Sequence, residues 1–340
     1  MTLITYPTRV HFADGVLEEA LHSELERAGS GSALLVSDES LAGSVLMDRV
    51  LSGVRPRVLT DHVSFCATDA LRDIATDTAR NRQAPDVIVA FGTAQAIELG
   101  RKIRFSVDQV GATRPALFAL PAVDGLPDPC NRNLESKQAG LPSVVICDPT
   151  VNIGAGQGAS LRATVMSLIR CVEAYLSLGY NPPADGMALD GLGRCIASLE
   201  KIDTAAGLDL HREVMAAGLN AFLSQEKGVG PVQTMTSSLV GEAGNDKRAA
   251  IARLVLPGIM RTRAMDVSKA DVLRKVLSVA DEPLTDATAR ILGGVEMPDT
   301  LAALGVPHAA LETAAQSVAG NAGLTYQNAR SVLEDIYEGA

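Results

Sequence analysis

Tryptophan is absent from this chain, and aromatic residues of all kinds make up only 3% of it. Basic residues are outnumbered by acidic ones, which gives a formal net charge of -10 and an isoelectric point near 5.0. Proteins that bind nucleic acids normally present a basic surface, often with aromatic side chains on which bases stack. The composition therefore argues against nucleic acid and favours small molecules or further copies of the chain as partners.

Cysteine is also scarce. The chain has an odd number of cysteines, and no two of them form a Cys-x-x-Cys pair: Cys66, Cys130, Cys147, Cys171 and Cys195. This pattern indicates neither a disulfide framework nor a cysteine zinc site. We therefore expect a reducing compartment and assign the protein to the cytoplasm.

Long hydrophobic runs are lacking as well. No apolar run approaches the roughly 18–20 residues needed to cross a bilayer. The first twelve residues, MTLITYPTRVHF, do not show the charged and then apolar pattern of a signal peptide. We expect a soluble protein that has no membrane partner.

Short apolar runs alternate with helical patterns as far as about residue 149. The intervening segments 16–29 and 67–82 repeat apolar residues at three and four positions, as amphipathic helices do. Such alternation predicts a mostly parallel sheet with helices on both faces, in which ligands bind beyond the C-terminal strand ends. The runs expected to form strands are 9–12, 33–38, 56–59, 86–92, 115–121 and 143–149.

The second half of the chain has a different pattern. After the glycine-rich segment 151–160, which we interpret as a linker, β-branched runs nearly vanish and helical spacing continues from Leu161 onward. A chain of 340 residues is long enough for two cores. We therefore predict an α/β domain over residues 1–154, an all-α domain over residues 155–340, and a ligand cleft between them.

The most informative stretch runs from Val87 to Ile103. Its β-branched run breaks at Gly92 and continues with helical spacing, which predicts a strand, a turn and the start of a helix. Such a junction points backbone N–H groups at a phosphate, although an ordinary turn fits the local sequence about equally well. Asp38 ends another predicted strand, where it could bind a ribose or an adenine edge, or cap the turn at Glu39 and Ser40.

Several strings, in this order, resemble one known family. They are RVHFADG (9–15), GTAQAIELGR (92–101), LPSVVICDPTVN (141–152), RATVMSLIRCVEAYLSLGYNP (162–182), LVLPGIM (254–260) and LAALGVP (301–307). Together they resemble the iron-containing alcohol dehydrogenase superfamily over nearly the whole chain, and most closely its maleylacetate reductases. The resemblance implies a Rossmann-like sheet domain with a helical domain, as in dehydroquinate synthase-like proteins, and NAD(P)H as the cofactor.

The nucleotide segment departs from the family pattern. The GGGS turn that binds the cofactor in the family is matched by Gly92, Thr93, Ala94 and Gln95, so side chains stand where a pyrophosphate needs close backbone approach. The family's PTTxxTGSE stretch, which lines the nicotinamide, is matched by residues 121–129 without its threonines. Both changes weaken the inference that a dinucleotide binds.

The metal site implied by the resemblance is also altered. Family members usually hold a divalent metal with one aspartate and three histidines, and the matching positions here are Met166, Arg170, Ser238 and Arg248. These residues do not form a histidine and aspartate cage, so we expect no metal. The chain's histidines fall elsewhere and are interpreted as surface or packing residues: His11, His22, His62, His211 and His308.

If the resemblance places Arg170 and Arg248 on opposite walls of the cleft, their guanidinium groups replace the lost cation, with Lys247 beside one of them. Arginine pairs bidentately with carboxylates, which predicts a small anionic substrate. The same groups could stabilise a developing oxyanion, as a metal does. The alternative is that both arginines are solvated or pair with Glu173, Glu242 or Asp246.

Three further groups of residues are candidates. Glu173, near Tyr175, could act as an acid or base or could make a buried hydrogen bond. Gln233 and Ser238 belong to a hydroxyl-rich helix face that could bind substrate. Asp124 opens a polar cluster after the predicted strand 115–121, where a plain polar loop is an equally good interpretation; the cluster also holds Asp128, Asn131, Arg132 and Asn133.

The leading hypothesis is an NAD(P)H-dependent reductase similar to maleylacetate reductase. It would act without a metal on a small unsaturated or keto dicarboxylate in the catabolism of aromatic compounds. The alternatives are a cofactor-free lyase, isomerase or hydrolase acting on an anionic substrate, and a non-catalytic subunit. Ser238 lies in no GxSxG signature, which argues against a hydrolase triad. The resemblance also suggests a homodimer joined through the first strand.

Overall fold

A computed structural model describes residues 8–54, 63–65, 85–109, 113–122, 140–202, 207–263, 265–279, 282–319 and 324–339. Contacts divide the chain into two compact units. The first contains Met1–Ala159 and Gly207–Met215, and the second contains Ser160–Ala206 and Ala216–Ala340. The sequence pattern suggested one boundary after residue 154, whereas the chain returns to the first unit once more.

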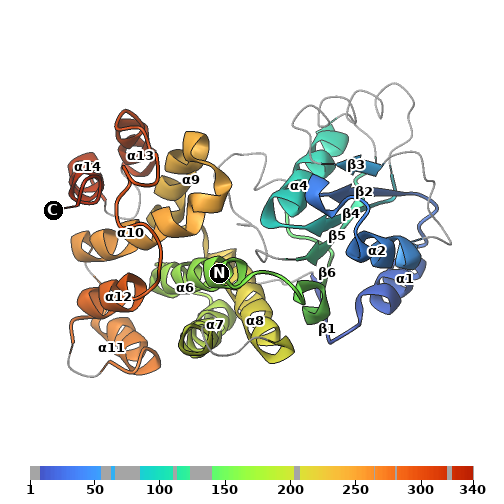
Figure 1. The fold of residues 1–340 in the computed structure, drawn as a ribbon, viewed down its shortest axis with the longest axis horizontal. Helices are drawn as coiled ribbons and strands as arrows, with labels where there is room; N and C mark the ends of the chain where they lie inside the picture. The colour runs from blue at the N-terminus through green and yellow to red at the C-terminus, as the bar shows by residue number, and fades with distance from the viewer. Residues whose placement is uncertain are drawn as a thin grey trace. The chain divides into compact units, whose positions relative to one another are not determined.

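A six-stranded parallel sheet forms the centre of the first unit (Figure 1). Its strand order is β1-β6-β5-β4-β2-β3, and every neighbouring pair is parallel. Strands β4 and β6 are buried along their whole length, as expected for strands covered on both faces. The strands are β1 (Arg9–Phe12), β2 (Ala33–Ser37), β3 (Val63–Phe65), β4 (Val87–Gly92), β5 (Ala116–Pro121) and β6 (Val144–Cys147).

Helices cover both faces of this sheet. Helices α1 (Leu17–Arg27) and α2 (Val45–Val54) lie on one face and α4 (Ala94–Gln109) lies on the other, as right-handed crossovers require (Figure 1). Helix α4 approaches the sheet closely at Gly100, where a Cβ would stand 2.9 Å from the Cβ of Ala90. The glycine therefore sets how near α4 lies to the sheet.

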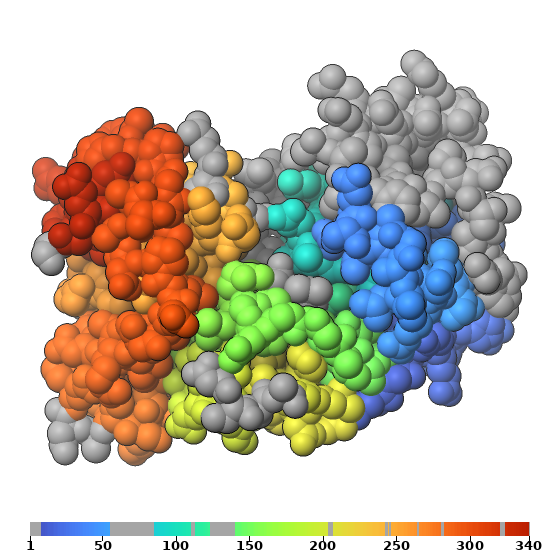
Figure 2. Space-filling model, viewed as in Figure 1, coloured from blue at the N-terminus to red at the C-terminus, as the bar shows by residue number. Residues whose placement is uncertain are grey.

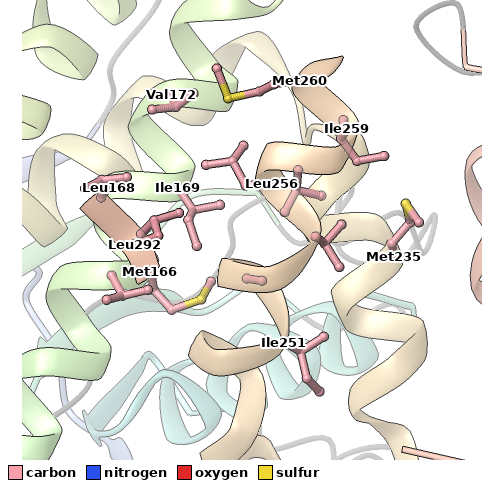
Figure 3. Close-up of a cluster of buried hydrophobic side chains, with 14 of the residues drawn as sticks. Met166, Leu168, Ile169, Val172, Met235, Ile251, Leu256, Ile259, Met260 and Leu292 are labelled. Carbon is pink, nitrogen blue, oxygen red and sulfur yellow. The ribbon is translucent and has the colours of Figure 1, made fainter. Parts of the chain in front are cut away.

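Every regular element that the structure describes in the second unit is a helix. Side chains of α6, α9, α10 and α12 meet in its core, among them Met166, Ile169, Met235, Leu256 and Leu292 (Figure 3). The C-terminal helices, coloured orange to red, form one continuous surface on the face shown in Figure 2. None of the described helices combines the length and apolar character needed to traverse a bilayer. The helices from residue 157 onward are α6 (Gln157–Leu176), α7 (Pro182–Lys201), α8 (Leu208–Ser224), α9 (Pro231–Ala243), α10 (Arg248–Thr262), α11 (Val267–Val276), α12 (Leu284–Gly293), α13 (Ala310–Val318) and α14 (Tyr326–Asp335).

The predicted fold class, a parallel α/β part followed by a helical part, is confirmed. Five of the six predicted strands are present, and the sixth, 56–59, lies outside the described residues, as does the predicted helix 67–82. One interpretation was wrong in part. The segment 151–160 is not all linker, because α6 already begins at Gln157.

Three described cysteines are buried, each in a different element. Burial raises the pKa of the Cys147 thiol in β6 to about 12. In α6 and α7, burial likewise raises the pKa of Cys171 and of Cys195 well above that of a free thiol. Cys66 and Cys130 lie outside the described residues.

Candidate functional site

Gly92 forms the predicted turn between strand and helix. It ends β4 at the C-terminal edge of the sheet, and α4 begins two residues later. Its φ of +129° is in the left-handed region, and a Cβ there would stand only 2.1 Å from Oδ2 of Asp38. Glycine is therefore required here. Thr93 and Ala94 are half-buried and Gln95 is exposed, so the start of α4 is open to solvent.

Asp38 follows β2, the strand beside β4, and bonds to this turn. Its Oδ2 accepts a hydrogen bond from the N–H of Thr93 at 2.6 Å, and its Oδ1 accepts one from the Thr93 hydroxyl at 2.8 Å. The carboxylate thus holds the residue that precedes α4 and lies near the N-terminus of that helix, where negative charge is favourable. The predicted cap on the turn at Glu39 and Ser40 was wrong, since no side-chain bond from Asp38 closes that turn.

The four positions that match the family's metal ligands all lie in the second unit. Met166 is a core residue of α6 (Figure 3), and Arg170, one turn later, is only 6% exposed. Ser238 on α9 donates its hydroxyl to the carbonyl of Thr234 at 3.3 Å. Arg248 opens α10 and donates from Nη1 to the hydroxyl of Ser237 at 3.0 Å. Arg248 therefore contacts the middle of α9 at the residue before Ser238.

These four side chains do not fit a divalent metal. A guanidinium group is a donor only and has no lone pair with which to bind a cation, so Arg170 and Arg248 would repel one. A thioether and a hydroxyl do not supply the histidine and carboxylate ligands of such a site. Within the described ranges, no three His, Cys, Asp or Glu side chains are grouped so as to hold a metal ion. Metal independence stays a prediction.

Glu173 binds the start of α9. Its Oε1 accepts a hydrogen bond from the N–H of Val232 at 2.7 Å, and its Oε2 accepts from the N–H and the side-chain amide of Gln233 at 3.2 and 3.1 Å. Glu173 is 5% exposed, so these are buried, charge-assisted bonds. The geometry agrees with the interpretation of Glu173 as a buried hydrogen-bonding group. Its acid or base role, and the contact of Gln233 with substrate, stay predictions.

The remaining candidates are dispersed. Lys247 donates from Nζ to the carbonyl of Leu304 at 2.9 Å, so its ammonium group is tied to the segment before α13. Asp124 and the other members of its polar cluster lie outside the described residues. Lys247 is therefore adjacent to Arg248 in sequence, but the two side chains bind different partners.

Sequence reasoning missed the buried Asp148, which follows β6. Its Oδ1 accepts hydrogen bonds from the N–H of Gly15 at 2.8 Å and from the N–H and hydroxyl of Thr150 at 3.0 and 2.6 Å. Its Oδ2 accepts from the N–H of Leu17 at 3.2 Å and from Nη2 of Arg49 at 2.8 Å. Burial alone would raise the pKa of Asp148, but these bonds outweigh it and lower the pKa. The aspartate fixes the starts of α1 and of the segment after β6.

No family model matches the chain. Among curated proteins, it is similar to 4-hydroxybutyrate dehydrogenase from Cupriavidus necator, with 25% identity over 299 residues that cover 78% of each chain. It is also similar to maleylacetate reductase from Burkholderia cepacia, with 25% identity over 341 residues, 96% of this chain and 92% of the relative.

Solved structures share the fold over almost the whole chain. A 1,3-propanediol oxidoreductase gives a TM-score of 0.80 at 18% identity and covers 97% of this chain and 98% of its own. Maleylacetate reductase from Agrobacterium tumefaciens gives 0.75 at 20% identity, with 100% and 98% covered. An iron-containing alcohol dehydrogenase from Corynebacterium glutamicum gives 0.77 at 18% identity, with 99% and 98% covered. At these identities the likeness shows the fold.

Proposed function

We propose that this chain, a divergent member of the iron-containing alcohol dehydrogenase family, is an NAD(P)H-dependent oxidoreductase. The relatives reported above are dehydrogenases and reductases, which supports this reaction class. The observation that carries the proposal is the turn at Gly92, where a left-handed glycine at a parallel strand end precedes a solvent-accessible helix start. Such a turn is where a dinucleotide binds in this class of sheet.

The turn still offers groups that a dinucleotide can use, despite the side chains that replace the family's glycines. The first N–H groups of a helix have no partner within the helix, and those after Thr93 are available to a phosphate. A carboxylate accepts about four hydrogen bonds, so Asp38 can bind a ribose hydroxyl while it keeps Thr93. When bound, the nicotinamide supplies the hydride.

We propose further that the substrate is a small keto or unsaturated dicarboxylate, of the kind formed when aromatic rings are cleaved, and that no metal takes part. The resemblance to maleylacetate reductases supports the substrate class. Arg170 and Arg248 would bind carboxylates and stabilise negative charge that develops on a carbonyl oxygen. Support comes from the burial of Arg170 and from the bond by which Ser237 orients Arg248. Glu173 acts as a positioning residue for α9.

Cofactor binding tests the proposal first. NADH and NADPH are titrated against the purified protein, with fluorescence quenching and thermal stability as the two readouts. At least one cofactor is expected to bind, and Asp38→Ala is expected to weaken its binding. Asp48→Ala, an exposed residue of α2, is the matched control and should bind as the parent does. No response to either cofactor at millimolar concentration ends the reductase proposal and leaves a cofactor-free lyase, isomerase or hydrolase, or a non-catalytic subunit.

Substrate binding and metal content test the finer proposal. Arg248→Ala is expected to weaken dicarboxylate binding by about 2 kcal/mol or more, because it removes one partner of a charged pair. Arg274→Ala, whose arginine makes an exposed ion pair with Asp271, is the control. Unchanged affinity in Arg248→Ala rules out its role. Stoichiometric iron or zinc in active protein would disprove metal independence.

We also propose a homodimer that forms through β1. This strand pairs with β6 on one side only within the described sheet, and it leaves Val10 and Phe12 38% and 39% exposed. An unpaired edge of this kind is suited to pairing with a second copy. Size-exclusion chromatography with light scattering should give a dimer for the parent and a monomer for Phe12→Glu. A monomeric parent refutes the proposal.

A further inference from the structure

A cavity of about 190 Å³ opens within the second unit, and neither Arg170 nor Arg248 lines it. One wall is apolar and is built by side chains of α6, α9 and α10: Val172, Leu176, Val232, Leu256, Ile259 and Met260. Four of these residues are labelled in Figure 3, where Val172 and Met260 lie close to each other. The apolar wall continues to the surface at Leu178, which lines the cavity and is 88% exposed.

Two cations complete the lining. Arg263 follows α10, and its Nε is buried without a hydrogen-bond partner. Lys269 of α11 donates from Nζ to the carbonyls of Tyr175 and Ser177 at 2.7 and 3.0 Å, and it lies 5.3 Å from the centre of the Tyr175 ring. An ammonium group has three N–H donors, so one remains for a ligand. Among the described residues neither cation makes a close ion pair, although the charge of Lys269 also acts on Asp266.

Two carboxylates also line the cavity, but both serve helix starts. Glu173 binds the first N–H groups of α9, as described above. Asp266 accepts from the N–H groups of Ser268 and Lys269 at 2.8 and 3.2 Å and so caps α11. The positive ends of these helices offset both negative charges. The unsatisfied Nε of Arg263 therefore remains to attract an anion, with the third N–H of Lys269 beside it.

We propose that this cavity binds a short aliphatic carboxylate, with its tail against the apolar wall and its carboxylate at Arg263 and Lys269. A guanidinium group binds a carboxylate through two parallel bonds, which would use the buried and unsatisfied Nε of Arg263. The volume equals that of about six water molecules at about 30 Å³ each. This cavity volume is well below that of pockets for drug-sized ligands. The cavity can therefore hold only a small ligand, such as one with a tail of about five carbons.

This site is separate from the oxidoreductase proposal, because it uses neither the turn at Gly92 nor Arg170 and Arg248. The test is a calorimetric titration of the full chain with hexanoate. Acetate supplies the charge without the tail, and hexanol supplies the tail without the charge. Hexanoate is expected to bind saturably and at least about tenfold more tightly than either comparator, since both halves of the ligand contribute.

Variants locate the ligand. Arg263→Gln is expected to weaken hexanoate binding about tenfold, and Leu178→Asp is expected to weaken it by placing a negative charge at the mouth. Leu178 is exposed, so this second variant leaves the fold intact. Arg261→Gln is the matched control, since Arg261 is an exposed arginine two residues away that does not line the cavity. Circular dichroism confirms that each variant is folded.

Three results would overturn the proposal. The first is the absence of saturable hexanoate binding. The second is equal affinity in the parent, Arg263→Gln and Leu178→Asp. The third is loss of hexanoate binding in Arg170→Ala while Arg263→Gln binds normally, because the carboxylate would then occupy the proposed substrate site. Failure of NADH and NADPH to bind would disprove the oxidoreductase proposal and leave this one intact.

Discussion

Gly230 lies directly against the carboxylate of Glu173: a Cβ on Gly230 would stand 2.1 Å from Oε1. Gly230 is also the residue that precedes α9, so the carboxylate reaches the start of that helix across a backbone that carries no side chain. The pair joins α6 to α9 at a buried point. The effect of a substitution at one of these residues on stability should therefore depend on the other residue.

Removal of the Glu173 carboxylate should destabilise the second unit. Glu173→Ala leaves the buried N–H groups of Val232 and Gln233 without their charged acceptor, which should lower the free energy of unfolding by about 2–4 kcal/mol. Glu200→Ala, an exposed residue of α7, should change it by less than about 0.5 kcal/mol. Urea denaturation measures both. A Glu173→Ala variant as stable as the control would show that the cap contributes nothing.

The close approach of Gly230 and Glu173 can be measured as a coupling free energy between substitutions at the two positions. Gly230→Ala should destabilise the parent by about 1–3 kcal/mol, because the new methyl group has no space. The same substitution should cost less in Glu173→Ala, where the carboxylate is absent. A double-mutant cycle by denaturation gives the difference. Additive effects of the two substitutions would contradict the close approach.

Gly92→Ala should destabilise the first unit by about 1–3 kcal/mol, because the φ of +129° strains any side chain and Asp38 occupies the space. Gly156→Ala is the matched control in the same unit, since nothing lies within 4 Å of its Cβ position and no left-handed φ is required. Chemical denaturation compares the two. If Gly92→Ala were as stable as Gly156→Ala, the turn would tolerate a side chain and would not require glycine.

Gly100→Ala and Gly193→Ala should differ in sign. Both glycines lie in helices, where alanine is favoured by up to about 1 kcal/mol. At Gly193 in α7 the new methyl group meets nothing within 4 Å, so we expect a gain. At Gly100 it would meet Ala90 at 2.9 Å and Leu117 at 3.3 Å, so we expect a loss of about 1–3 kcal/mol. Thermal and urea unfolding should show opposite shifts for the two variants.

The stability of the first unit should fall in acid through Asp148. Because its pKa is lower in the folded state than the ordinary 3.8, its contribution is complete above that value and is lost as the pH falls through the folded pKa. Asp148→Asn should cost about 1–3 kcal/mol near neutral pH, because the amide cannot accept all of the hydrogen bonds made to the carboxylate, while Arg49 keeps Glu18 as a partner. The difference from the parent should shrink below the ordinary pKa. Urea midpoints across this pH range measure it, and a constant difference would refute the assignment.

The sequence predicted which strands and helices form more accurately than it predicted the residues at which they begin and end. Continuous β-branched runs identified β4 and β6, because strands buried on both faces must be apolar throughout. Glycines at 154, 156 and 158 suggested a linker, yet α6 begins at Gln157. Packing of the following apolar residues outweighs the low helix propensity of one glycine in the first turn. Strand β3, with only three residues, gave no usable pattern.

The contacts made by the candidate site residues were not predicted from the sequence. Asp38 and Thr93 are 55 residues apart, and only the parallel register of β2 beside β4 brings them together. Glu173 and Val232 are 59 residues apart and meet through the packing of two helices. Such pairs depend on tertiary contacts that local spacing does not encode. Asp148 was missed because an aspartate after an apolar run resembles an ordinary turn residue.

Each unit contains a buried thiol whose rate of chemical modification can report when that unit opens. Alkylating reagents attack the thiolate, and burial both withholds that form and blocks access at Cys147 and Cys171. With Cys66, Cys130 and Cys195 replaced by serine, modification at Cys147 would time the opening of the sheet unit, and modification at Cys171 that of the helical one. Mass spectrometry of the two peptides would then tell whether the halves of this molecule come apart together or one after the other.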